Sequence, residues 1–168
     1  MQTRKLVATT LVHGLAAISL SAAISAGELP KEGSFDIMSC ASGTTSVISF
    51  SKTHTATISE ITGVSLSNPP GGLYDKGTYR CISLSSNFDG KVVGRSVCEG
   101  LDPEDGSKRL VVTTNQDGKV TREFIAGTGK YEGLVEVTAN LQNVGGLSAI
   151  KPGTTQGCGR STGTYKMK

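Results

Sequence analysis

Apolar and polar residues alternate along much of the chain, and short turns containing glycine separate the alternating stretches. The clearest example is the pair of segments 81–88 and 91–98, which flank Asp89-Gly90. Asp-Gly favours a two-residue hairpin turn of type I′, because both central positions of that turn need a positive φ. The alternation separates the two faces of the hairpin, as in an antiparallel sheet with one buried and one solvated face. We expect the apolar face to be the buried one; it carries Ile82, Leu84, Phe88, Val93 and Val97.

The same pattern over the rest of the chain predicts about eight short strands. A second Asp-Gly turn joins segments 109–116 and 119–126, whose mixed faces the pattern does not orient. No segment has a helical period, while glycine and β-branched residues are abundant. This pattern predicts an all-β fold, a small antiparallel β-barrel of about eight strands. The other expected strands lie at 35–40, within 44–67 with a bend near 52–53, at 74–80, at 134–144 and at 159–167.

The first 26 residues have a different composition, which predicts a secretion signal. A basic pair at residues 4–5 precedes residues 6–26, which contain no Lys, Arg, Asp or Glu and end in small residues. We expect cleavage after Ala26, with one residue to either side as the alternatives. Polar residues dilute this stretch below the about 20 predominantly apolar residues of a spanning helix. We therefore expect a signal peptide at 1–26, one β-barrel domain at 27–168 without a membrane span, and a periplasmic or secreted protein.

Loss of the signal would leave the domain with a net charge close to zero. The full chain carries 17 basic and 14 acidic residues, a net charge of +3 that residues 4–5 largely account for. This balance argues against a nucleic-acid partner, which needs a basic patch. Only one histidine, His54, follows the signal, and no C-x-x-C spacing occurs, so we expect neither a metal site nor a cofactor. The glycine-rich segment 127–133 lacks the spacing of a phosphate-binding loop, and we expect a turn with Tyr131 packed beneath it.

All four cysteines fall in the expected mature domain. An even number of cysteines in an exported protein predicts disulfides. If Phe88 lies opposite Lys91, then Cys81 falls opposite Cys98 at a non-hydrogen-bonded position, where Cα atoms are about 4.5 Å apart. A disulfide tolerates that separation. The pair Cys40–Cys158 follows by subtraction and would join the first strand of the barrel to the last.

Two segments near the C-terminus resemble a known family. They are Ala126-Gly127-Thr128-Gly129-Lys130-Tyr131-Glu132-Gly133 and Gly163-Thr164-Tyr165-Lys166. A Gly-Thr-Gly-Lys-aromatic turn before a strand, with Gly-Thr-Tyr near the end, is similar to the allene oxide cyclase and dirigent type of β-barrel, which uncharacterised exported bacterial proteins share. The resemblance covers roughly the last 45 residues and implies an eight-stranded barrel with a lumen. The catalytic residues of that family have no matching positions here, so catalytic residues stay unknown.

Three polar residues fall on faces that the alternation assigns to the interior. Arg95 falls opposite Leu84, and His54 and Glu60 share a face with Ile58 if the alternation continues through the bend. A buried charge needs a partner or nearby water. Our hypothesis is that His54, Glu60 and Arg95 line the lumen and orient an anionic or carbonyl ligand. The alternative is that one or more of them lies solvated at a barrel mouth or strand end.

Three classes of function fit these expectations. A barrel lumen favours a protein that binds a small, partly apolar molecule. An isomerase or cyclase of the allene oxide cyclase type is the second class, and a structural or interaction protein with a filled barrel is the third. The sequence does not fix the oligomeric state.

Overall fold

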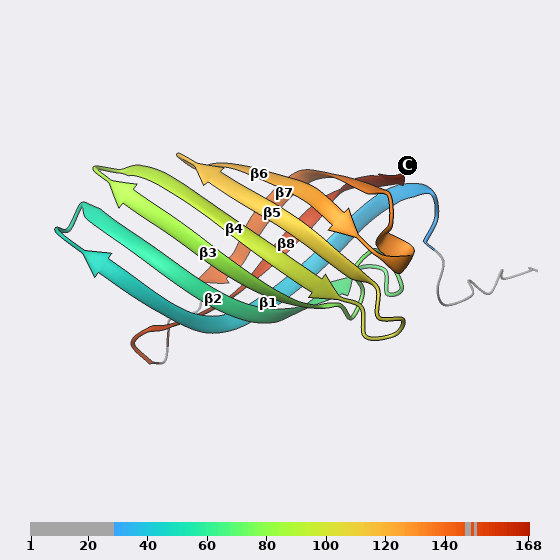
Figure 1. The fold of residues 1–168 in the computed structure, drawn as a ribbon, viewed down its shortest axis with the longest axis horizontal. Helices are drawn as coiled ribbons and strands as arrows, with labels where there is room; N and C mark the ends of the chain where they lie inside the picture. Colours follow the sequence, from blue (N-terminus) through green and yellow to red (C-terminus); the bar gives the residue numbers. More distant parts are fainter. Residues whose placement is uncertain (1–28, 147–148, 150) are drawn as a thin grey trace, which may run out of the picture.

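The computed structural model describes residues 29–146, 149 and 151–168, so the expected signal peptide lies outside the described residues. The described part is one antiparallel sheet of eight strands and one short 3-10 helix (Figure 1). The elements are β1 (Glu32–Ser49), β2 (His54–Ser67), β3 (Thr78–Phe88), β4 (Lys91–Leu101), β5 (Lys108–Gln116), β6 (Lys119–Gly127), η1 (Gly129–Tyr131), β7 (Leu134–Gly146) and β8 (Thr154–Met167). The predicted all-β class and strand number are confirmed.

The sheet curls into a half-barrel. Its strand order is β6-β5-β4-β3-β2-β1-β8-β7, so β6 and β7 form the two edges. No backbone ladder joins these two strands among the described residues, but side chains bridge them, and Arg122 of β6 forms an ion pair with Glu136 of β7. We call the line along which β6 and β7 meet the seam.

Both Asp-Gly turns adopt the expected conformation. The φ angles are 53° at Asp89 and 84° at Gly90, and 50° at Asp117 and 85° at Gly118. Positive φ at both central positions is the mark of the type I′ turn. The side chain of an asparagine two positions before each Asp accepts a hydrogen bond from the turn glycine N–H, at 2.9 Å in the first turn and 3.0 Å in the second.

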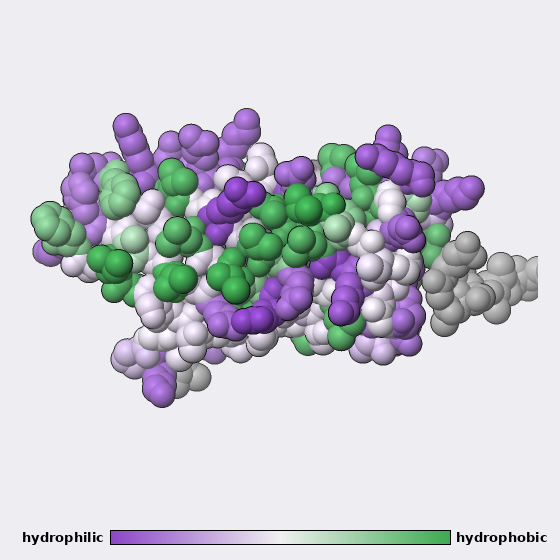
Figure 2. Space-filling view, in the orientation of Figure 1, coloured by the Kyte–Doolittle hydropathy of each residue, from purple (hydrophilic) through white to green (hydrophobic). Residues whose placement is uncertain are grey.

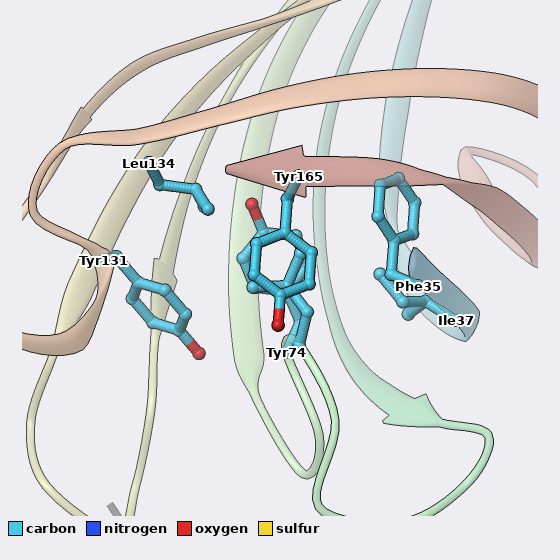
Figure 3. Packing of buried hydrophobic residues seen from close by; sticks show 7 residues of the cluster. Phe35, Ile37, Tyr74, Tyr131, Leu134 and Tyr165 are labelled. Carbon is cyan, nitrogen blue, oxygen red and sulfur yellow. The ribbon is translucent and has the colours of Figure 1, made fainter. Parts of the chain in front are cut away.

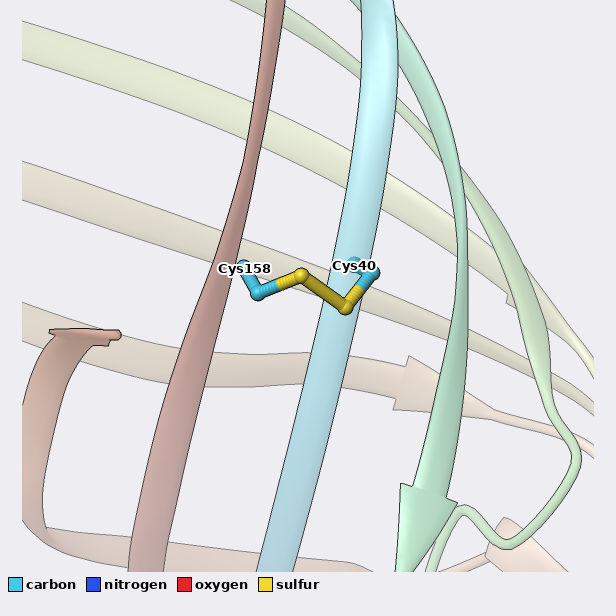
Figure 4. The surroundings of a disulfide bond; sticks show 2 residues. All are labelled: Cys40 and Cys158. Carbon is cyan, nitrogen blue, oxygen red and sulfur yellow. A yellow bond between two sulfur atoms is a disulfide. The ribbon is translucent and has the colours of Figure 1, made fainter. Parts of the chain in front are cut away.

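Both predicted disulfides are present. Cys81 pairs with Cys98 across the β3–β4 ladder, and Cys40 pairs with Cys158 across the β1–β8 ladder (Figure 4). The Cα–Cα distance is 4.1 Å in each pair, in line with the short separation expected for directly opposite residues. The first and last strands are neighbours, as the second pairing required.

The prediction of which face is buried is wrong. The apolar face of the β3–β4 hairpin points outward, where the side chain of Leu84 is 62% exposed, while Cys81 on the serine-rich face is 5% exposed. Alternation separates two faces but does not say which of them a curled sheet encloses. The concave side of this narrow half-barrel holds mainly small residues, and these leave room for a few large polar side chains.

One end of the half-barrel is closed by a compact aromatic core (Figure 3). The loop between β2 and β3 inserts Leu73 and Tyr74, and η1 inserts Tyr131, which is fully buried. Ser65 of β2 holds the loop in place by donating a hydrogen bond to the carbonyl of Tyr74 at 2.7 Å. The expectation that Tyr131 packs beneath the glycine-rich turn is confirmed. The core consists of Phe35, Ile37, Leu73, Tyr74, Tyr131, Leu134 and Tyr165.

Candidate functional site

A cavity of about 160 Å³ lies inside the half-barrel, next to the aromatic core. All eight strands and the β2–β3 loop contribute residues to its wall, so the cavity is formed by the whole curled sheet and not by one hairpin. Its polar lining includes two arginines, Arg109 of β5 and Arg122 of β6, together with Tyr74 and Tyr79. The remaining wall consists of small or apolar residues: Ile37, Ser39, Ser65, Cys81, Cys98, Gly100, Val111, Thr113, Leu141, Gly159 and Ser161, with Glu99 at its margin.

Arg109 is the most unusual residue of this cavity. It is 6% exposed, and its guanidinium lies over the ring of Tyr74, 4.2 Å from the ring centroid, and 5.6 Å from that of Tyr131. Among the described residues no carboxylate forms an ion pair with it, and its buried Nη1 has no hydrogen-bond partner. Burial lowers the pKa of Arg109 from its ordinary value, but a guanidinium stays protonated in proteins. The lumen therefore holds a cation whose charge is not matched by a bonded anion.

Two glycines leave the space that the buried side chain of Arg109 occupies. A Cβ on Gly100 would lie 2.5 Å from Cζ of Arg109, and a Cβ on Gly77 would lie 3.1 Å from both terminal nitrogens. Only glycine allows the guanidinium to approach the β4 backbone this closely. The strand thus carries a cradle for the arginine side chain.

Arg122, in contrast, has a carboxylate as its ion-pair partner at the seam, although the geometry does not give its buried Nε a hydrogen bond. Its Nε lies 3.1 Å from Oε1 of Glu136, whose side chain is almost completely buried. Glu136 also accepts hydrogen bonds from the Tyr74 hydroxyl at 2.8 Å and from the Thr138 hydroxyl at 2.8 Å. Burial, with the negative charge of Glu136 as the next cause, raises the pKa of Tyr74 well above its ordinary value. Tyr74 therefore stays a neutral donor, and the Arg122–Glu136 charges balance.

A second buried carboxylate also has a positively charged partner. Asp102, in the loop after β4, is 1% exposed. Its carboxylate forms an ion pair with Lys130 and accepts hydrogen bonds from the Tyr131 hydroxyl at 3.1 Å and the Glu104 N–H at 2.9 Å. Burial alone would raise the pKa of Asp102, but these donors, Lys130 first, hold it below its ordinary value. Of the buried charges described, only that of Arg109 remains without a partner.

The three residues that the sequence suggested do not meet in the lumen. They lie on the outer face, because the face assignment was inverted. His54 lies at the start of β2 with its Nε2 3.3 Å from Oδ2 of Asp89. Glu60 receives a hydrogen bond from Arg80 at 2.8 Å, and Arg95 is exposed opposite Leu84. The placement of these residues on a lumen wall is therefore corrected.

Sequence reasoning missed the residues that do line the lumen. Arg109 opens the second hairpin, whose faces could not be oriented. Glu136 and Thr138 alternate with Val135 and Val137 along the strand expected at 134–144, and the outward exposure of Val137 (60%) shows that the polar face of this strand is the inner one. Taking the polar face of the strand at 134–144 as the inner one would have selected Glu136, whereas Arg122 shares its face with Val120 and Phe124 and carries no such signal.

The fold and the cavity define a class of protein: a disulfide-bonded antiparallel half-barrel with a cationic, aromatic-walled lumen. Among the described residues, no group of three or more His, Cys, Asp or Glu side chains could hold a metal ion, and no helix is long and apolar enough to cross a membrane. Comparisons with protein-family models, with curated proteins and with solved structures gave no match.

Proposed function

We propose that this protein is an exported binding protein whose lumen takes a small molecule with a carboxylate and an apolar part. The observation that carries the proposal is the buried, unpaired guanidinium of Arg109 in the wall of the cavity. A guanidinium binds a carboxylate through charge-assisted hydrogen bonds, often two in parallel. The bound carboxylate would supply the missing partner of Arg109.

The size and walls of the cavity support a small, partly aromatic ligand. A volume of about 160 Å³ is close to that of an engineered cavity of about 150 Å³ that holds benzene. Tyr74 and Tyr79 offer aromatic surface beside the arginine. A ligand with one ring or a short chain next to its carboxylate satisfies both the charge and the volume.

Binding is favoured over the two other functions expected from the sequence. An isomerase would need an acid–base pair facing the ligand, whereas both oxygens of Glu136 already accept hydrogen bonds from neighbouring side chains. A filled structural barrel would leave no space, whereas the aromatic core closes one end and a cavity remains beside it. The resemblance to the allene oxide cyclase and dirigent barrels also favours a role for the lumen. Export is proposed from the N-terminal sequence, and the two disulfides are compatible with it.

The proposal is tested with benzoate and its neutral amide, benzamide, as probes of equal shape. Benzoate should raise the melting temperature, because a ligand that binds only the folded state stabilises it by about 2.7 kcal/mol at 100 times its Kd. This corresponds to a rise of several degrees for a domain of this size. Benzamide should give a much smaller rise. Native mass spectrometry of the purified protein with benzoate should show one bound benzoate per chain.

Two arginine variants provide the comparison. Arg109→Gln should abolish the benzoate effect, while Arg95→Gln, on the outer face, should retain it. If benzoate and benzamide act equally, or if Arg95→Gln and not Arg109→Gln loses the effect, the lumen is not the anion site. Circular dichroism of each variant confirms that the sheet is intact.

A further inference from the structure

The two faces of the curled sheet differ in their chemistry. Large apolar side chains gather on the outer face of β2–β5 (Figure 2). The wall of the lumen instead carries side-chain hydroxyls, and four of them have no hydrogen-bond partner among the described residues: those of Ser39, Tyr79, Thr113 and Ser161. Polar groups inside a protein normally have a partner, so these hydroxyls are satisfied by water or by the polar groups of a ligand.

Tyr79 differs in this respect from the two tyrosines that lie against Arg109. The hydroxyl of Tyr74 donates a hydrogen bond to Glu136 at 2.8 Å. The hydroxyl of Tyr131 donates one to Asp102 at 3.1 Å. Both are therefore committed to buried carboxylates, whereas the hydroxyl of Tyr79 is free to bind a molecule in the cavity.

The charges of the lumen indicate that Tyr79 meets an uncharged group. Arg109 and Arg122 are positive and Glu136 is negative, so one ligand carboxylate brings the net charge of the lumen to zero. A second buried carboxylate would have no counter-charge, which is costly. Burial raises the pKa of Tyr79, although the two arginines act in the opposite direction. The hydroxyl of Tyr79 thus keeps its proton at neutral pH and can both donate and accept a hydrogen bond.

Glycines determine where the polar ends of Tyr79 and Arg109 lie. Gly63, Tyr79, Gly100 and Arg109 are opposite one another on consecutive strands, from β2 to β5. A Cβ on Gly63 would lie 2.6 Å from the Tyr79 hydroxyl oxygen, and one on Gly100 would lie 2.5 Å from Cζ of Arg109. Each side chain therefore lies over the glycine of the preceding strand. Because β2 and β4 are two strands apart, the hydroxyl and the guanidinium are separated by about 10 Å, at about 4.8 Å per strand.

We infer that the hydroxyl of Tyr79 binds a hydroxyl of the ligand at the end opposite its carboxylate, so that the lumen takes a hydroxylated aromatic acid. This inference rests on the proposed function, in which Arg109 holds the carboxylate. A ring with a carboxylate and a hydroxyl on opposite carbons, with a hydrogen bond of about 2.8 Å at each end, spans roughly the same distance. A ligand without the hydroxyl would displace water from Tyr79 without replacing its hydrogen bond, which lowers affinity.

Isothermal titration calorimetry at pH 7 with benzoate and two of its hydroxy derivatives tests this inference. 4-Hydroxybenzoate, whose hydroxyl is opposite the carboxylate, should bind about fivefold more tightly than benzoate, the gain from one added hydrogen bond of ordinary strength. 2-Hydroxybenzoate is the isomeric control. Its hydroxyl lies beside the carboxylate and is too far from Tyr79 when Arg109 holds that carboxylate, so it should bind no more tightly than benzoate.

Two variants assign the preference to one hydroxyl. Tyr79→Phe removes the hydroxyl and keeps the ring. It should bind benzoate at least as tightly as the wild type does, and 4-hydroxybenzoate no more tightly than benzoate. Thr113→Val is the matched control, because it removes another unpartnered hydroxyl of the same wall with little change of shape. It should retain the fivefold preference, and circular dichroism checks that both variants keep the sheet.

The outcomes separate this inference from the proposed function. Equal affinity of the wild type for benzoate and 4-hydroxybenzoate would overturn the inference and leave the proposed function in place. A preference that persists in Tyr79→Phe, or that Thr113→Val loses instead, would do the same. If neither acid binds, or if both still bind to Arg109→Gln, the proposed function fails and the inference fails with it.

Discussion

At the scale of the residue, Arg109 is the feature that sets this lumen apart from an ordinary apolar core. Burying an unpaired charge is costly, so most buried charges in proteins have a partner. Here the aromatic faces of Tyr74 and Tyr131 offset part of the cost, because a cation is attracted to the face of a ring. The remaining cost is what an anionic ligand would relieve. The position of the guanidinium in turn depends on Gly100, the glycine of β4 that lies against it.

Gly100→Ala tests that dependence. The new Cβ would lie 2.5 Å from Cζ of Arg109, so the side chain must move, and overpacking of this kind costs about 1–3 kcal/mol. We expect a lower free energy of unfolding in urea and a loss of the benzoate effect. Gly94→Ala is the control on the same strand and face, since its Cβ would lie 3.3 Å from Cβ of Ser85. Equal losses in both variants would mean that β4 rejects any side chain there and that Arg109 is not the cause.

At the scale of the element, the sequence predicted the hairpins correctly but did not predict which face of the sheet is the inner one. Asp-Gly at 89–90 and 117–118 fixed both turns, and the register from the first of them placed Cys81 opposite Cys98. These are local facts, set by φ preferences and by counting along a ladder. The choice of inner face is not local, because it depends on how the whole sheet curls. The inversion moved His54, Glu60 and Arg95 from the expected lumen to the outer surface.

The seam between β6 and β7 should behave differently from the other strand junctions. Backbone amides that lack a ladder partner exchange with solvent more readily than paired ones. We expect hydrogen–deuterium exchange to be fastest in β6 and β7 and slowest in β1–β3, which have hydrogen-bonded neighbours on both sides. Glu136→Gln should accelerate exchange in β6 and β7 further, because it removes the charge that holds Arg122 across the seam. Protection of β6 equal to that of β2 would indicate a hydrogen-bonded, closed barrel in solution.

At the scale of the whole molecule, the candidate site is a product of closure. Its wall draws on all eight strands and on a loop, so residues separated by more than a hundred positions meet there. Hydropathy along the chain cannot bring such residues together. Arg109 and Arg122 carry no motif, and Glu136 became visible only when the orientation of β7 was known. What the sequence did predict, the strand number, the turns and both disulfides, follows from short-range rules and from the parity of the cysteines.

The stability of the molecule should fall in acid through Asp102. Its pKa is held below the ordinary value in the folded protein, and an unfolded Asp has a pKa of about 3.9. The ion pair with Lys130 is therefore fully present above about pH 4 and is lost as the pH falls through the lower, folded pKa. Asp102→Asn should lower the free energy of unfolding at pH 7 by about 1.5–3 kcal/mol, the range for a hydrogen bond to a charged group. The gap to the wild type should narrow in urea titrations from pH 7 to pH 3. Asp36→Asn, which breaks an exposed ion pair with Arg160, is the control. Its defect should vanish in 1 M salt, because that salt concentration reduces the Debye length to about 3 Å and screens exposed charges. An Asp102→Asn defect that also vanishes in 1 M salt, or that is the same at pH 3 as at pH 7, would show that the buried ion pair does not stabilise the fold.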